Sequence, residues 1–225
     1  MARIYLKSTG PERWADYLAE PIKHWQTGYS AKTLAHSWED ADGFPAEIQA
    51  ALNASEYLAG LELLLAIPEH QVPLPGGSRP TQSDLWALGR AGNEIVSVAV
   101  EGKVAEPFGP TLAEWQAEAS SGKVARLQYL RDQLSLSEPP PGTIRYQLLH
   151  RTVAPLIEAR RFGATHAVML VHSFSKTNEW FEDYAAFALL FGIAAVPNTI
   201  ARVGERGGIN LHIGWVSGNP DYLAR

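Results

Sequence analysis

The chain has 225 residues, a net charge of −5 and 46% hydrophobic residues, which is enough to bury one large core. It contains no cysteine, so a disulfide framework and a cysteine-based zinc site are excluded. No apolar run is long enough to cross a bilayer, and the first residues lack the apolar core of a signal peptide. We therefore expect a cytoplasmic protein that does not act at membranes.

The N-terminal segment, residues 1–43, is predicted to be a helical elaboration of one compact domain that spans residues 44–225. Ser30 is a residue typical of helix N-caps, and a helix is expected from there through residue 38. The segment also contains Trp14, Trp25 and Trp38, whose predicted role is packing.

The next part of the chain predicts one helix followed by three extended segments. Residues 45–53 form the short helix, which carries Glu47, and residues 61–72 are expected to be extended. The apolar run at 85–88 enters a turn signal at 91–93, and the β-branched run at 95–104 leaves it. These two runs are predicted to pair as a hairpin.

The hairpin is where the sequence predicts chemistry. Alternation along a strand places Glu101 and Lys103 on one face and the valines between Val96 and Val104 on the other. Pairing around the turn brings Asp84 close to Glu101. Two carboxylates suit Mg²⁺ or Mn²⁺, a hard cation that takes a few oxygen ligands, and a lysine beside them can hold a phosphate or a water molecule.

The remaining chain predicts alternating helices and strands. A proline-rich loop at 137–142 interrupts them, and Pro155 is expected to kink the longest helix. Helices are expected at 111–119, 122–134, 144–162 and 178–191, and strands at 165–174 and 209–216.

Asp84 followed by Glu101-Gly102-Lys103 resembles the signature of the PD-(D/E)XK, or restriction-endonuclease-like, nuclease superfamily. The resemblance covers about residues 44–174 and implies an α/β fold with a mixed central sheet, an αβββαβ core and flanking helices. It implies that Asp84 and Glu101 hold the metal ion and that Lys103 positions water and phosphate.

Two further residues take roles from this resemblance. Glu47 would be the additional acid on the preceding helix and a third metal ligand, and Gln147 would be the glutamine on the helix after the hairpin. The chain departs from the usual pattern before the aspartate, where Ser83 stands and the nearest proline is Pro80.

A structural interpretation competes at each of these positions. Glu101 and Lys103 could form an ordinary ion pair on a solvated strand face. Glu47 is explained equally well as an exposed glutamate early in a helix, and Gln147 as a surface amide. Glu69 is expected to be a loop or edge-strand residue, and His172, at a strand end, to be a satisfied structural group.

The expected function is metal-dependent hydrolysis of a phosphodiester in nucleic acid, with DNA as the favoured partner. The net charge of −5 does not favour a tight grip on long duplexes, although basic residues on two predicted helices could form a local positive rim. The alternatives are a catalytically silent member of the same fold that binds nucleic acid or protein, and an interaction domain with an accidental resemblance. RNA as the substrate, a single- or double-stranded substrate, endo- or exonuclease mode and a homodimer stay open. The basic residues are Lys123, Arg126, Arg131, Arg145, Arg151, Arg160 and Arg161.

Overall fold

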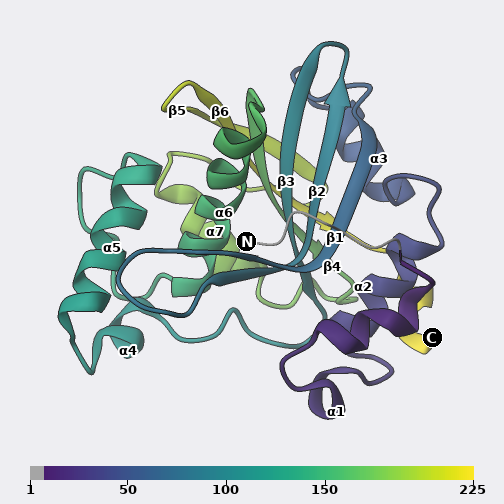
Figure 1. Cartoon of the computed structure of the whole chain (residues 1–225), viewed down its shortest axis with the longest axis horizontal. Helices are drawn as coiled ribbons and strands as arrows, with labels where there is room; N and C mark the ends of the chain where they lie inside the picture. Colours follow the sequence, from purple (N-terminus) through teal and green to yellow (C-terminus); the bar gives the residue numbers. More distant parts are fainter. Residues whose placement is uncertain (1–7) are drawn as a thin grey trace.

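The computed structural model describes residues 8–225 and centres on a six-stranded sheet in the order β1-β2-β3-β4-β6-β5 (Figure 1). β1, β2 and β3 are antiparallel, β3, β4 and β6 run parallel, and β5 returns antiparallel to β6. The predicted mixed α/β sheet is confirmed. The strands are β1 (Glu62–Val72), β2 (Thr81–Ala91), β3 (Glu94–Lys103), β4 (His166–Ser173), β5 (Thr199–Arg206) and β6 (Ile209–Ser217).

Helices cover both faces of this sheet because its central strands are apolar on both sides (Figure 1). One hydrophobic cluster joins the sheet to α4 (Leu112–Gln116), α5 (Ser121–Leu134), α6 (Tyr146–Phe162) and α7 (Phe181–Leu189). The other joins it to η1 (Pro11–Tyr17), α2 (Ser30–Glu39), α3 (Ala46–Asn53) and η2 (Pro220–Ala224). The short α1 (Pro21–His24) lies between η1 and α2 in the chain. Within residues 8–225, no helix is long and apolar enough to span a bilayer.

The face assignment of β3 is confirmed. Val96, Val98 and Val100 belong to the cluster on the α2 and α3 face. The side chains of Glu101 and Lys103 point to the opposite face, which α6 covers. The sequence predicted this because β3 keeps a strict alternation with no bulge along its pairing with β2.

The prediction missed one strand, β5. This edge strand is half-exposed along most of its length and is interrupted by an irregularity between Arg202 and Gly204. Its polar composition therefore gives only a weak apolar pattern. The predicted helix at 178–191 is also shorter than expected, because α7 begins only at Phe181.

The predicted N-cap role of Ser30 is wrong. Helix α2 begins at Ser30, its N-cap is Tyr29, and no side chain of the cap itself accepts a hydrogen bond. The Ser30 N–H instead donates to Glu106 Oε1 at 2.9 Å, and the Val104 N–H donates to Glu106 Oε2 at 3.0 Å. A distant carboxylate thus satisfies the helix start and ties α2 to the segment just after β3.

The packing role of the tryptophans is confirmed. Trp14 and Trp38 are buried in the same cluster as Leu34 and Val98, and Trp25 is partly buried against it. The N-terminal segment therefore shares its hydrophobic core with the sheet.

Candidate functional site

Three acids lie side by side on neighbouring strands. The pairing of β2 with β3 reaches Leu85 and Val100, so Asp84 and Glu101 stand one residue beyond. On the other side, the pairs Pro68–Leu85 and His70–Ser83 leave Glu69 next to Asp84. All three carboxyl groups, together with Lys103, line one pocket of about 270 Å³. The structure therefore brings together the Asp84, Glu101 and Lys103 of the sequence prediction.

Glu101 is the most heavily bonded member of the pocket and is 3% exposed. Its Oε1 accepts from Lys103 Nζ at 2.8 Å and from Gln147 Nε2 at 2.6 Å. Its Oε2 accepts from Arg151 Nε at 2.5 Å. The structure thus places Gln147, the candidate for the glutamine on the helix after the hairpin, beside Glu101, and it adds Arg151.

Arg151 is the principal residue that sequence reasoning placed elsewhere. It was expected on a positive rim, whereas its side chain is only 12% exposed and also donates to Thr81 Oγ1 at 3.1 Å. A signal was available, because Gln147 and Arg151 are four residues apart and so share one face of α6. The same face therefore supplies two donors to one carboxylate.

Glu69 also belongs to the pocket, although the sequence predicted only a loop or edge-strand residue. It lies within β1, which agrees with the expectation of an edge-strand residue. Its backbone adopts the left-handed region, with a φ of 51°. Such a conformation costs about 1 kcal/mol or more in a residue other than glycine and often marks functional sites. Its Oε2 accepts from Gln82 Nε2 at 2.6 Å.

The acids differ in their pKa values because their partners differ. Burial would raise the pKa of Glu101, but the charges of Arg151 and Lys103 outweigh it and lower the pKa to about 2. Loss of hydration, followed by the charge of Glu101, raises the pKa of Asp84 to about 7. Loss of hydration and the charge of Asp84 raise the pKa of Glu69 to about 8. Glu101 is therefore a fixed anion, while the other two acids hold protons near neutrality.

These shifts predict how stability depends on pH. Asp84 has a pKa raised from 3.8 to about 7, so between these values the folded protein binds more protons than the unfolded chain. In the presence of a metal chelator, the free energy of unfolding should therefore fall as the pH rises through this window. The Asp84→Asn variant removes this loss and should be more stable than wild type by about 4 kcal/mol near pH 8, and equal to it near pH 4. Urea unfolding across this pH range measures the difference.

The matched control for this experiment is Asp132→Asn, which changes an exposed aspartate on α5. It should leave the pH dependence of wild type unaltered. A variant Asp84→Asn that still loses stability along the wild-type slope would contradict the protonation of Asp84.

The structure places Glu47 outside this pocket, which corrects its expected position. Its Oε1 accepts from His172 Nε2 at 3.0 Å and from the Asn219 N–H at 3.2 Å. His172 is fully buried and also receives the Trp38 indole N–H at 3.3 Å on Nδ1. Glu47 lies outside the pocket because α3 directs its side chain to the face of β4 that α2 covers. The acids of the pocket gather on the opposite face of the sheet, which α6 covers. His172 is a satisfied structural group, as expected.

The oxygen atoms that remain available decide whether a cation fits. Among residues 8–225, Asp84 Oδ2 accepts one hydrogen bond, from the Gly102 N–H at 2.8 Å, and Glu69 has a second oxygen beyond the one bound to Gln82. The buried Gln147 Oε1 has no hydrogen-bond partner among residues 8–225. Mg²⁺ commonly takes one or two carboxylates and fills its other positions with water, so Asp84 with Glu69 or Glu101 meets that need. No group of three or more potential metal ligands is assembled in the described part of the chain.

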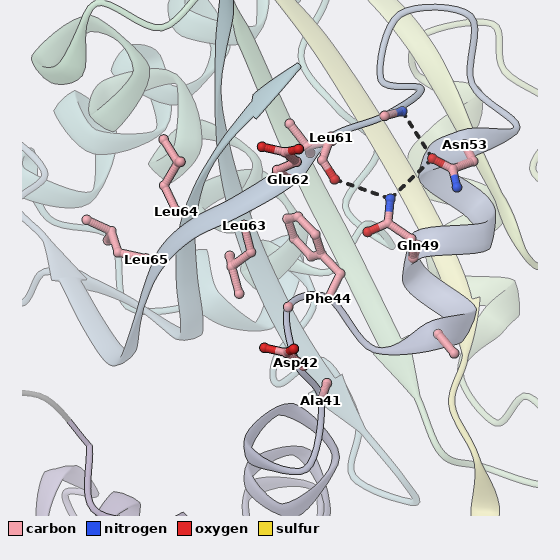
Figure 2. A pocket seen from close by; sticks show the side chains of 13 residues that line it. Ala41, Asp42, Phe44, Gln49, Asn53, Leu61, Glu62, Leu63, Leu64 and Leu65 are labelled. Carbon is pink, nitrogen blue, oxygen red and sulfur yellow. Dashed lines mark hydrogen bonds between the residues drawn. The ribbon is translucent and has the colours of Figure 1, made fainter. Parts of the chain in front are cut away.

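A larger pocket of about 920 Å³ lies between α3 and the start of β1 (Figure 2). Its amides are already bonded, since Gln49 Nε2 donates to Asn53 Oδ1 and to the Leu61 carbonyl, both at 3.2 Å. Its charged lining residues are both acidic, Asp42 and Glu62, and Glu62 is already paired with Arg90 at 3.6 Å. The smaller pocket is the better candidate because it combines acids, a lysine and perturbed pKa values.

The fold and the smaller pocket define a mixed α/β protein with a cluster of carboxylates, lysine and arginine at the end of its central strands. Over residues 7–220, the sequence matches the family described as "Domain of unknown function (DUF6946)", and the chain belongs to that family. No curated protein and no solved structure gives a match.

Proposed function

We propose that the protein is a metal-dependent nuclease, an enzyme that hydrolyses phosphodiester bonds in nucleic acid. The observation that carries the proposal is the convergence of Asp84, Glu101 and Lys103 on one pocket. These residues come from two strands and match the spacing of the PD-(D/E)XK pattern.

Each residue has a role that its contacts support. Asp84 and Glu101, with Glu69 beside them, offer the oxygen atoms for Mg²⁺ or Mn²⁺. The bound cation would lower the pKa of a water molecule and neutralise charge on the phosphoryl group. Lys103 is held by Glu101 at 2.8 Å and lines the pocket, so its ammonium group positions the attacking water and a phosphate oxygen. Arg151 and Gln147 act through Glu101 and are positioning residues.

The order of elements supports the finer fold assignment, a restriction-endonuclease-like core. α3, β1, β2, β3, α6 and β4 follow one another as helix, three strands, helix and strand, with α4 and α5 inserted before α6. β4 joins β3 in parallel, so the sheet is mixed at the strand that carries Glu101 and Lys103.

One observation favours the second candidate, a catalytically silent protein of this fold that binds nucleic acid or protein. Glu101 forms ion pairs with two cationic side chains, Lys103 and Arg151, which balance its charge. Such a pair can persist as structure alone. Metal binding separates the two candidates.

The test is calorimetric titration of Mg²⁺ and Mn²⁺ near pH 8, followed by cleavage of mixed DNA and RNA on the same samples. Wild type should bind the cation, and Asp84→Asn should weaken binding by about 100-fold or more because a direct ligand is lost. Glu69→Gln should weaken binding as well. Cleavage should be lost together with binding in Asp84→Asn.

The matched control is Glu47→Gln, which removes a carboxylate that lies on α3 and is bonded to His172. This variant should bind the cation as wild type does. Absence of cation binding by wild type would overturn the metal-dependent mechanism and leave the silent binding protein as the better account.

A further inference from the structure

The acidic pocket is closed on one side by the N-terminal segment. Five residues between the end of η1 and the first turn of α2 line the pocket together with the carboxylates, and we call them the N-terminal wall. They are Leu18, Ala19, His24, Ser30 and Ala31.

The N-terminal wall is fixed to the rest of the protein. Glu106 links the start of α2 to the end of β3 through the Ser30 and Val104 N–H groups. On the next turn of α2, Leu34 packs so closely on β3 that a Cβ atom at Gly102 would lie 3.3 Å from it. Trp14 Nε1 donates to Glu39 Oε1 at 2.7 Å and holds η1 on α2. The pocket therefore has a built boundary on this side.

The pocket is small, and its described lining residues offer little aromatic surface on which a base could stack. Its volume of about 270 Å³ lies just below the range of about 300–1,000 Å³ that is usual for ligand pockets. Among residues 8–225, His24 is the only ring-bearing residue that lines it. A phosphodiester group fits such a space, while a whole nucleotide pair with both of its backbones does not.

Basic side chains of the N-terminal segment, within residues 8–225, pair with carboxylates, except that Lys32 on α2 donates to Thr27 Oγ1 at 3.3 Å. Lys23 pairs with Glu20 at 3.1 Å, and Arg13 pairs with Asp16 at 3.1 Å. His24 also lies 3.6 Å from Glu20. Binding to duplex DNA depends on many contacts between cations and phosphates, and the chain carries a net charge of −5.

We infer that the substrate is a flexible single strand or a single-stranded end of nucleic acid. One phosphodiester of this strand enters the pocket beside the N-terminal wall, and the protein does not recognise the attached base. This inference rests on the proposed nuclease function. A single strand can bend into a walled pocket, whereas a duplex must first be unpaired and unstacked there.

The experiment compares four substrates with wild-type protein and Mn²⁺. They are a mixed-sequence single-stranded oligonucleotide, the same strand in a blunt duplex, that duplex with a single-stranded overhang, and bis(p-nitrophenyl) phosphate. The single strand and the overhang should be cleaved about 100-fold faster than the blunt duplex, because the duplex has to be opened first.

Each other outcome overturns one proposal. Equal cleavage of the blunt duplex and the single strand overturns the inference and leaves the nuclease proposal intact. Hydrolysis of bis(p-nitrophenyl) phosphate without cleavage of any oligonucleotide also overturns the inference. No hydrolysis of any of the four substrates overturns the proposed function itself, and the inference with it.

A variant pair tests the N-terminal wall directly. The double variant Leu18→Ala, His24→Ala removes side-chain bulk from the N-terminal wall. It should raise the cleavage rate on duplex relative to that on single strand by about tenfold, since less of the duplex must be opened. The matched control is Ile22→Ala. Ile22 lies on α1 with His24, is 93% exposed and is not among the residues that line the pocket. An unchanged ratio in a folded double variant would show that the wall does not select the substrate.

Discussion

The Lys103→Met variant is expected to lose metal-dependent cleavage by about 1,000-fold in single-turnover rate, the size of effect seen when a charge-stabilising donor is removed. Methionine keeps the length and apolar stem of the lysine, so the change removes the ammonium group alone. Glu101 retains its bonds to Gln147 and Arg151, and the pocket should therefore keep its shape. The measurement is cleavage under single-turnover conditions with saturating Mn²⁺.

The control for this prediction is Lys123→Met on α5. Lys123 is half-buried, whereas Lys103 is buried, and Lys123 Nζ donates to the Trp115 carbonyl at 2.7 Å, outside the pocket lining. That variant should cleave at the wild-type rate. If Lys103→Met cleaves as fast as Lys123→Met, Lys103 has no part in the reaction.

The Arg151→Met variant should lower the free energy of unfolding by about 3 kcal/mol, because it leaves a buried carboxylate with less compensating charge. Glu101 is 3% exposed and has a pKa lowered to about 2, so it stays ionised across the range of ordinary experiments. Urea unfolding at neutral pH in chelator measures the change.

A double-mutant cycle assigns the loss to the charge pair. Glu101→Gln combined with Arg151→Met should be more stable than Arg151→Met alone, because the stranded anion is gone. Arg145→Met is the matched control, since Arg145 pairs with Asp183 at 2.8 Å in a more exposed setting and should cost about 1 kcal/mol or less. A double variant no more stable than Arg151→Met would contradict the buried-charge explanation.

Much of the fold could be predicted because the apolar patterns of its central elements are strong. β3 has a regular alternation, and α6 has a long buried face, so both were found near their observed bounds. The same alternation placed Glu101 and Lys103 on one face, and the hairpin turn fixed the position of Asp84 opposite them.

The remaining site residues could not be predicted because tertiary packing places them. Glu69 reaches the pocket only because β1 adopts a left-handed residue there, which no local pattern indicates. Glu106 caps α2 from a segment 76 residues away in the sequence. Glu47 was predicted to be a metal ligand from its position on the helix before the hairpin. Its side chain instead contacts His172 on the other side of the sheet.

The shared core of the N-terminal segment has a practical consequence for the choice of fragments. A shortened protein that begins at residue 44 would keep every acid of the pocket, yet it would uncover Leu85, Val98 and Val100, which lie under Trp14, Leu34 and Trp38 in the same cluster. Newly exposed apolar strands of this kind promote aggregation. Expression, crystallisation and activity assays should therefore use a chain that retains η1 and α2, even where the catalytic hairpin alone is of interest.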